Sequence, residues 1–203
     1  MKIFCVGRNY GEHAKELGND VPENPVIFSK PDTALLKNSD PFYLPYFSDD
    51  IHHEVELVIR INRAGKKIDE KFAGNYFNEI GLGIDFTARD IQTHLKSKGL
   101  PWELAKAFDC SAPIGKFITI DRIAQREPIN FSLKKNGIIV QKGNSGEMIF
   151  SFEKIVSFVS QYFTLKVGDL IYTGTPAGVG KVNIGDKLEG YIEDELMLTC
   201  EVK

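Results

Sequence analysis

The chain is 203 residues long, 42% hydrophobic and formally charged −3 at pH 7, so it has enough apolar residues to bury a sizeable core as one domain, residues 1–203. The small net charge and the lack of any basic block of five or more residues argue against a nucleic acid or a membrane surface as a partner. No apolar run approaches the length that spans a membrane, and the N-terminal apolar stretch is too short for a signal peptide.

The first half of the chain predicts strands and helices in mixed order. Asn9 is a residue type that caps helices, Gly99 is typical of a helix end, and Pro101 suits a first helical position. Periodicity predicts strands at Ile3–Val6, His53–Ile61 and Glu79–Phe86, and helices from Asn9 to about Leu17, over Asp69–Phe77, from Thr87 or Ala88 to Lys98, and over Trp102–Phe108.

The second half is richer in strands. Asn136-Gly137 is a strong hairpin signal between two strand-like runs. The predicted elements are strands at Ile129–Lys135, Ile138–Lys142, Asp169–Tyr172, Lys187–Ile192 and Leu196–Val202, and a helix at Glu153–Tyr162. This mixture predicts an α+β, β-rich fold, with residues 1–45 as a candidate small cap or lid segment.

Three cysteines, Cys5, Cys110 and Cys200, are odd in number, widely spaced and without a Cys-x-x-Cys pair. We expect free thiols of a reducing compartment rather than disulfides or zinc ligands. Together with the absence of a signal peptide, this predicts a cytoplasmic location.

The most informative candidate residues are three carboxylates, Glu54, Glu56 and Asp85. Residues two apart on a strand share a face, so Glu54 and Glu56 would project side by side with Cβ atoms roughly 7 Å apart. Two like charges at that distance repel by about 2 kcal/mol at an effective dielectric constant near 20. A cation between them would remove this repulsion. Asp85, on a second predicted strand, would complete an all-oxygen site for a hard divalent metal.

The neighbours of these carboxylates leave alternatives open. Gly81 and Gly83 would share the Asp85 face and leave room for something to approach. Alternatively, the glycines mark a bulge, Asp85 caps the next helix, and the glutamates are ordinary surface residues. His52 and His53 are candidate ligands, but no His-Glu-x-x-His pattern is present, and at least one of them must point away from the Glu54 face.

Three other features suggest chemistry. His13 and Glu16 lie three apart on a predicted helix, where a carboxylate beside an imidazole suits a general base acting on water; an exposed helical pair is the alternative. The glycine-rich loop Thr173–Gly180 offers backbone N–H groups and two hydroxyls to a small anion, unless it is simply a turn. Lys106, on a short amphipathic helix, is either a buried cationic anchor or a snorkelling surface lysine.

In order and spacing, these motifs resemble the fumarylacetoacetate hydrolase family, most closely its short acylpyruvase and oxaloacetate decarboxylase branch. A small departure is Cys110, where many relatives have threonine. The matching segments are Gly7–Tyr10 with His13 and Glu16, Phe28–Pro31, His52–Leu57, Asp85–Gln92, Lys98–Trp102 with Lys106, Met148–Phe150 and Thr173–Gly180.

The resemblance implies a fumarylacetoacetase C-terminal-domain-like mixed β-roll, usually a homodimer, that binds a small 2-oxo acid. It also implies Mg²⁺ or Mn²⁺, with Ca²⁺ as a substitute. The helix with His13 and Glu16 acts in the family as a lid. The implied roles are metal binding by Glu54, Glu56 and Asp85, catalysis by His13, Glu16 and Lys106, and substrate binding by Arg8, Gln92, Thr175 and Gly174.

The implied activity is metal-dependent cleavage of the C3–C4 bond of acylpyruvates by hydrolysis, decarboxylation of oxaloacetate, or both, through an enolate that the metal stabilises. Two alternatives stay open. One is an isomerase, tautomerase or hydratase of 2-oxo and 2-hydroxydienoic acids in aromatic catabolism. The other, from a different class, is a non-catalytic protein that binds a metal and a keto acid.

Overall fold

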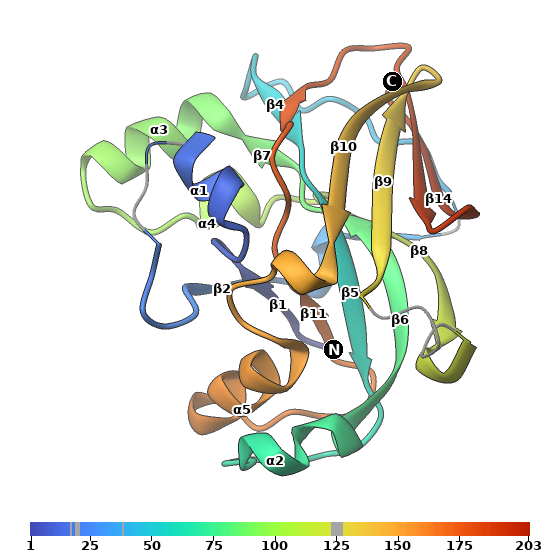
Figure 1. Ribbon diagram of the computed structural model, residues 1–203. Coiled ribbons are helices and arrows are strands. Elements are labelled where there is room, and N and C mark those ends of the chain that lie inside the picture. The colour runs from blue at the N-terminus through green and yellow to red at the C-terminus, as the bar shows by residue number, and fades with distance from the viewer. Residues whose placement is uncertain (17, 19–20, 38, 123–127) are drawn as a thin grey trace.

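Three β-sheets form the body of the molecule in a computed structural model that describes residues 1–16, 18, 21–37, 39–122 and 128–203 (Figure 1). The largest contains, in order across it, β2 (Ile27–Lys30), β1 (Ile3–Val6), β11 (Leu170–Tyr172), β5 (Val55–Ile61), β6 (Phe77–Ile84), β8 (Ala112–Thr119) and β3 (Leu35–Leu36). The second contains β10 (Ile138–Asn144), β9 (Asn130–Lys135), β13 (Lys187–Ile192) and β14 (Glu195–Glu201). The third contains β12 (Gly180–Lys181), β4 (Ile51–His53) and β7 (Thr87–Ala88).

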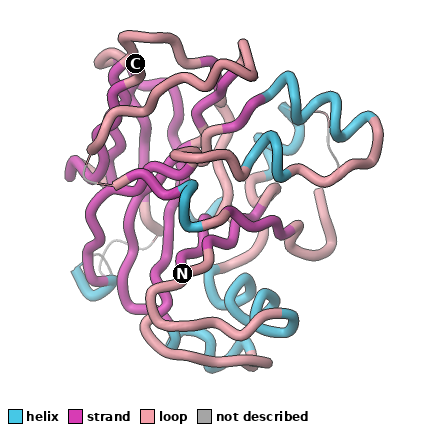
Figure 2. Tube along the Cα trace, turned by 180° about the vertical axis from the view of Figure 1, so that it is seen from behind, coloured by secondary structure: helices cyan, strands magenta, loops and turns pink. Residues whose placement is uncertain are grey.

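The α-helices lie around these sheets in separate groups (Figures 1 and 2). They are α1 (Gly11–Glu16), α2 (Glu70–Ala73), α3 (Arg89–Ser97), α4 (Glu103–Lys106) and α5 (Phe152–Tyr162). Helices α2 and α5 pack together at one end of the molecule, and α3 and α4 lie together at another. Short 3₁₀ turns occur at Asp32–Ala34, Gly74–Tyr76, Ile120–Arg122 and Ser145–Glu147. No helix among the described residues is long and apolar enough to cross a membrane.

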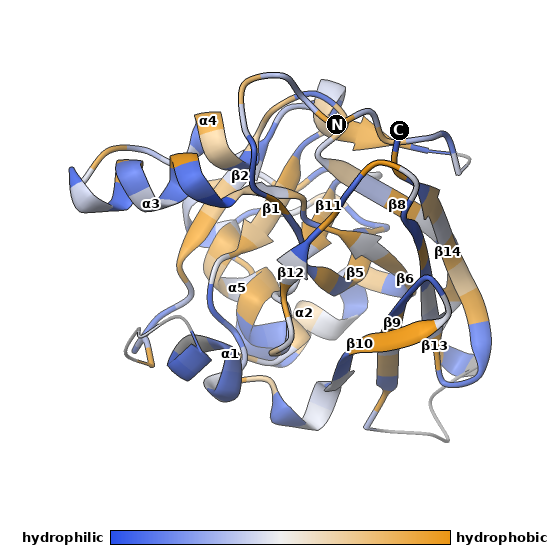
Figure 3. Cartoon of the chain, turned by 90° about the horizontal axis from the view of Figure 1, so that it is seen from above, coloured by the Kyte–Doolittle hydropathy of each residue, from blue (hydrophilic) through white to orange (hydrophobic). Residues whose placement is uncertain are grey.

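The core lies where the large sheet packs against the second sheet, which runs along one side of the molecule in Figure 3. Leu57 of β5 and Leu82 of β6 are fully buried, as are Leu133 of β9 and Leu188 of β13. Strand β5 is buried along almost its whole length because it lies in the middle of the large sheet. The pairs β1–β11 and β3–β8 are parallel and the other strand pairs of this sheet are antiparallel, so the predicted α+β, β-rich fold with a mixed sheet is confirmed.

Several predicted elements are confirmed with altered bounds. The hairpin β9–β10 surrounds Asn136-Gly137 as expected. The helix predicted over Asp69–Phe77 is α2 followed by a 3₁₀ turn. The Asp69 side chain caps the start of α2 by accepting a hydrogen bond from Lys71 N, and the 3₁₀ turn begins at Gly74. Helix α1 begins at Gly11, and its predicted end at Leu17 lies outside the described residues.

Other predictions need correction. Strand β6 ends at Ile84, so Asp85 lies just beyond the strand rather than within it. The predicted strand His53–Ile61 is broken at Glu54, which connects β4 of the small sheet to β5 of the large one. The eight-residue strand β8 was missed, because proline and glycine near its start interrupt the alternation of apolar residues.

Residues 1–45, which we suggested as a cap or lid segment, include β1 and β2. Both strands belong to the large sheet, and β1 is buried at all four positions because it pairs on both sides. Of the described residues in this segment, β3 also belongs to the large sheet, and α1, the 3₁₀ turn at Asp32–Ala34 and the loops lie outside the sheets.

The buried hydroxyl of Ser160 fixes α5 to the loop that precedes α2. Its Oγ accepts a hydrogen bond from Ile68 N at 2.8 Å and donates one to Ser157 O at 2.7 Å. Because Ser160→Ala leaves Ile68 N without a partner, we expect the free energy of unfolding in urea to fall by about 1–3 kcal/mol. Ser97→Ala, on the exposed face of α3, is the control and should change it by less than about 0.5 kcal/mol. Equal effects of the two substitutions would contradict this account.

Candidate active site

Three buried carboxylates converge where the large and small sheets meet. Glu54 joins β4 to β5, Glu56 lies within β5, and Asp85 directly follows β6. One oxygen from each lies within 4.8 Å of the others. The backbone contributes to this convergence, because Asp85 N donates a hydrogen bond to Glu54 O at 2.8 Å. The structure therefore brings together the three residues that the sequence predicted as metal ligands.

The glycines of β6 do not leave space for a ligand, contrary to our expectation. A Cβ on Gly83 would lie 2.5 Å from the Tyr172 ring, and one on Gly81 would lie 3.1 Å from the Phe117 ring. The room beside these glycines is therefore filled by aromatic side chains of the same sheet. The two glycines therefore serve the packing of these rings, and the carboxylates meet beyond the end of β6.

Two cations hold Glu54 in its ionised form. Lys106 Nζ lies 2.7 Å from Glu54 Oε2, 2.7 Å from Asp85 Oδ2 and 2.6 Å from Thr87 Oγ1, and Arg89 Nη2 binds Glu54 Oε1. Burial opposes ionisation of Glu54, but Lys106 and Arg89 outweigh it and hold the pKa of this carboxyl well below its ordinary value. Burial likewise opposes the charge of Lys106, yet Asp85 and Glu54 raise its pKa. Lys106 is thus a buried cation, not a snorkelling surface lysine.

A second buried lysine, Lys30, was not assigned a role from the sequence, although it lies in the Phe28–Pro31 motif. Its Nζ lies 2.8 Å from Asp85 Oδ1, but it donates hydrogen bonds to Lys106 O, Ser111 O and Ser111 Oγ. An ammonium has three N–H donors, so all three are already used. Asp85 Oδ1 consequently accepts no hydrogen bond from any described residue, although it is buried beside a positive charge.

Glu56 is the least compensated of the three carboxylates. Gly174 N donates a hydrogen bond to its Oε2 at 2.7 Å, and it forms no ion pair with a described residue. Burial, and then repulsion from Asp85, raises the pKa of the Glu56 carboxyl well above its ordinary value. A divalent cation would offset this repulsion. The all-oxygen donor set therefore fits a hard cation such as Mg²⁺ or Mn²⁺.

His13 and Glu16 of α1 form the predicted pair. His13 Nδ1 lies 3.1 Å from Glu16 Oε2, and His13 is only 3% exposed, so an exposed helical pair does not describe it. A positive charge on this imidazole would lower the Glu54 pKa, so His13 lies near that carboxylate. Gly178 N donates to both oxygens of Glu16, at 3.2 and 3.3 Å, so the glycine-rich loop holds α1 in place.

The hydroxyls of the glycine-rich loop are already used within the protein. Thr173 Oγ1 donates to Leu57 O, and Thr175 Oγ1 donates to Val55 O, each at 2.9 Å. Gly174 N is bonded to Glu56. A hydroxyl has one proton, so Thr175 would have to give up its bond to Val55 in order to donate to a substrate carboxylate. These bonds make the loop first of all a support for β5 and Glu56.

Of the other predicted substrate contacts, Gln92 is bonded to Arg89 at the site, whereas no hydrogen bond or ion pair joins Arg8 to the site among the described residues. Gln92 Oε1 accepts from Arg89 Nη1 at 2.6 Å, which directs the amide oxygen at the arginine and leaves the amide N–H groups as donors. Arg8 is half-buried and forms no hydrogen bond or ion pair with a described residue. Its charge acts on Lys96 of α3, where burial and then repulsion from Arg8 lower the lysine pKa.

Neither neighbouring histidine belongs to the carboxylate cluster. His53 is buried and bonds through Nδ1 to Gln141 Oε1 at 2.9 Å, and His52 Nε2 lies 3.0 Å from Asp50 Oδ1. Burial lowers the pKa of both imidazoles. We therefore do not retain either histidine as a metal ligand.

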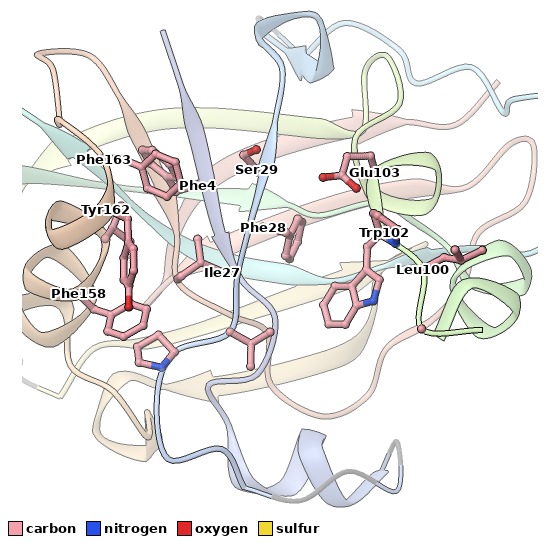
Figure 4. A pocket seen from close by; sticks show the side chains of 15 residues that line it. Phe4, Ile27, Phe28, Ser29, Leu100, Trp102, Glu103, Phe158, Tyr162 and Phe163 are labelled. Atoms are coloured by element: carbon pink, nitrogen blue, oxygen red, sulfur yellow. The ribbon is translucent and has the colours of Figure 1, made fainter. Parts of the chain in front are cut away.

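A separate cavity of about 700 Å³ lies along the edge strand β2 (Figure 4). Its walls are largely aromatic and aliphatic, with Glu103 as the charged side chain among them. None of the three clustered carboxylates lines it. Phe28 is part of its wall, and the ring centroid lies 5.3 Å from Lys106 Nζ. Its apolar lining does not suit a 2-oxo carboxylate, so the chemistry belongs at the carboxylate cluster.

Comparison with known proteins decides the family. The sequence model of the fumarylacetoacetate (FAA) hydrolase C-terminal family matches residues 2–203. The chain belongs to the fumarylacetoacetate hydrolase family. The resemblance carried by the sequence motifs is therefore confirmed over nearly the whole chain.

Relatives in this family carry names of enzymes of 2-oxo acids. The mitochondrial oxaloacetate tautomerase of Mus musculus is 42% identical over 201 residues, which cover 99% of this chain and 91% of the relative. The mitochondrial oxaloacetate decarboxylase of Dictyostelium discoideum is 44% identical over 189 residues, covering 93% and 87%. The solved fumarylpyruvate hydrolase of Pseudomonas aeruginosa, in complex with Mn²⁺ and pyruvate, is 35% identical with a TM-score of 0.94, covering 100% of this chain and 89% of that one.

Two polar residues that support this family site were missed by sequence reasoning. Asn9 is fully buried, and its amide donates to Phe150 O and Thr173 O and accepts from Phe150 N. We had read Asn9 only as a helix cap. Gln141, which belongs to a predicted strand but to no motif that we had assigned to the site, binds both His53 and Thr175. Sequence spacing contained no signal for either contact, because each joins segments brought together only by the fold.

Proposed function

We propose that this protein is a metal-dependent enzyme that hydrolyses the C3–C4 bond of acylpyruvates, decarboxylates oxaloacetate, or does both. The observation that carries the proposal is the cluster of three buried carboxylate oxygens within 4.8 Å, together with the buried His13, which lies near enough to act on Glu54. Relatives named as oxaloacetate and fumarylpyruvate enzymes support 2-oxo acids as the substrate class.

Glu54, Glu56 and Asp85 would hold Mg²⁺ or Mn²⁺. When bound, the cation supplies a Lewis acid for the keto oxygen of the substrate and for the negative charge that follows bond cleavage. The Mn²⁺ in the Pseudomonas aeruginosa structure supports this cofactor class. The three side chains present only oxygen donors, which separate Mg²⁺ from Mn²⁺ poorly.

The chain's own residues would then orient and protonate the substrate. Lys106 Nζ, between Glu54 and Asp85, places a positive charge where a 2-oxo acid carries its oxygens. The Gln92 amide, whose oxygen is bonded to Arg89, would offer its N–H groups as donors. We assign Thr175 and Gly174 to supporting β5 and Glu56, since their donors are used there. Arg8 stays a predicted substrate contact.

For hydrolysis, His13 acts as the base. If Nδ1–H donates to Glu16, the lone pair on Nε2 is available to take a proton from water. The hydroxide equivalent adds to the distal carbonyl, the C3–C4 bond breaks, and its electron pair stays on the pyruvate fragment. That fragment then takes a proton at C3. Decarboxylation releases carbon dioxide instead and needs no attacking water, so it makes less demand on His13.

Tautomerisation of oxaloacetate is a second candidate. The identity of 42% to proteins named oxaloacetate tautomerases favours it specifically. Keto–enol exchange needs a proton carrier at C3, a role that His13 would serve, since all three N–H donors of Lys106 are already bonded. If the protein tautomerises oxaloacetate but neither hydrolyses acylpyruvates nor decarboxylates oxaloacetate, tautomerisation is the function to assign.

We propose further that residues 1–203 act as one catalytic domain with α1 as its lid, because the Glu16–Gly178 contact joins the two. The family resemblance also implies a homodimer, which sedimentation equilibrium would test. A cytoplasmic location stays a prediction from the sequence, and the relatives named above include mitochondrial enzymes.

The decisive experiment is turnover with and without metal. Protein treated with EDTA and dialysed should lose at least about 99% of its turnover of acylpyruvates and oxaloacetate, since a Lewis acid contributes several kcal/mol to the barrier. Adding Mg²⁺ or Mn²⁺ should restore it. Full activity in the metal-free protein would exclude the proposal. Saturable oxalate binding without turnover on any 2-oxo acid would identify a non-catalytic binding protein.

A further inference from the structure

Gln141 is a buried polar side chain that a bulge turns toward the site. In the pairing of β10 with β9, Ile139 faces Lys134 and Gln141 faces Leu133, so Val140 is an extra residue. Bulges next to active sites commonly re-aim a side chain. Here Ile138 and Ile139 are exposed, whereas Gln141 is 1% exposed. The bulge in β10 therefore directs the Gln141 side chain toward the interior of the protein.

All four hydrogen-bonding positions of the Gln141 amide are occupied. Oε1 accepts from Val55 N at 3.0 Å and from His53 Nδ1 at 2.9 Å. Nε2 donates to Thr175 Oγ1 at 2.9 Å and to Pro176 O at 3.0 Å. A backbone N–H only donates and a proline carbonyl only accepts, so the orientation of the amide is fixed chemically. It follows that His53 Nδ1 carries a proton and donates it.

Two of these bonds lie on either side of Glu54. His53 ends β4 and Val55 begins β5, so Glu54 lies where the chain passes from the small sheet to the large one. Both neighbours of Glu54 are bound to one oxygen atom of Gln141. We propose that Gln141 is a positioning residue that holds Glu54 in the geometry needed for a divalent cation, an inference that rests on the proposed function.

The other two bonds extend this support to Glu56. They fix Thr175 and Pro176, next to Gly174, whose N–H binds Glu56. The same loop packs against the bulge, because a Cβ on Gly178 would collide with Val140 O, and Gly178 has a φ of +96° that favours glycine. One amide thus ties together the bulge, the loop and the two glutamates of the cation site.

The test is direct Mn²⁺ binding by titration calorimetry to the full-length, metal-stripped protein. Gln141→Met keeps the length of the side chain and removes all four bonds. We expect it to weaken Mn²⁺ binding about 10–100-fold, the usual effect of losing a group that supports a metal ligand. Gln141→Asn retains an amide that is one methylene too short to span both sides, and it should weaken binding by a smaller factor in the same direction.

A matched control separates positioning from general stability. Ser160→Ala also removes a buried hydrogen bond, but in α5 and without contact with the three carboxylates. It should lower the melting temperature and leave the Mn²⁺ dissociation constant within about 2-fold of wild type. All titrations are made at a temperature where circular dichroism shows each variant folded. Gln141→Asn carries the test if Gln141→Met does not fold.

The outcomes distinguish this inference from the function on which it rests. Wild-type Mn²⁺ affinity in a folded Gln141 variant would overturn the positioning role and leave the proposed function intact. Failure of the wild-type protein to bind Mn²⁺ would overturn both. Weakened binding in both Gln141 variants, with unchanged binding in Ser160→Ala, would support the inference.

Discussion

Glu54→Gln is expected to lower kcat/KM for 2-oxo acids by about 10³-fold or more and to weaken Mn²⁺ binding at least about 100-fold. The substitution preserves the shape of the side chain but removes the negative charge that pairs with Lys106 and Arg89. Loss of Lewis-acid assistance worth about 4 kcal/mol corresponds to about a thousandfold in rate. Steady-state kinetics with saturating Mn²⁺ measures the first effect, and titration calorimetry of Mn²⁺ into the metal-stripped protein measures the second.

Glu79→Gln is the matched control for this substitution. Glu79 lies on β6 of the same sheet and is ion-paired with Arg60 at 2.6 Å, but it takes no part in the carboxylate cluster. Removing its charge should change kcat/KM and Mn²⁺ affinity by less than about 2-fold, because half-exposed ion pairs contribute little. Comparable losses in both variants would show that the effect of Glu54→Gln is general destabilisation. Unchanged turnover in Glu54→Gln would exclude the proposed metal ligand.

The sequence predicted the carboxylates well because their signal is local. Period-2 spacing placed Glu54 and Glu56 together, and Asp85 was added from its place on a second predicted strand. The structure brings all three together, but by a different route from the one expected. Glu54 lies at a break between two strands and Asp85 lies beyond the end of β6, so neither residue is within a regular strand.

The supporting residues could not be predicted in the same way. Gln141 and Val55 lie 86 residues apart in the chain, and Lys30 and Ser111 lie 81 apart. Such contacts depend on how sheets pack and on a one-residue bulge, which periodicity does not report. Local patterns also misread Gly81 and Gly83, because only the fold shows that aromatic rings of neighbouring strands occupy the space beside them.

His13→Gln is expected to separate the candidate reactions. Hydrolysis of an acylpyruvate needs a base for the attacking water, and loss of a general base typically costs about 10²–10⁴-fold in rate. Oxaloacetate decarboxylation needs no water attack, so its kcat should fall by less than about 10-fold. Glu16→Gln should reproduce the same selectivity more weakly, since Glu16 orients the imidazole through the 3.1 Å contact with Nδ1. Both activities are measured on each variant at the same Mg²⁺ concentration.

The same helix supplies the control for this selectivity. Lys15 and Glu12 form an ion pair at 2.8 Å with the same spacing of three residues as His13 and Glu16, but on the exposed side of α1. Lys15→Gln should leave both activities unchanged, which would show that a charge change on the helix is not sufficient. Equal losses of hydrolysis and decarboxylation in His13→Gln would instead mean that His13 acts on a step common to both, such as protonation at C3. That result would move the proposed function toward oxaloacetate tautomerisation, where proton transfer at C3 is the whole reaction.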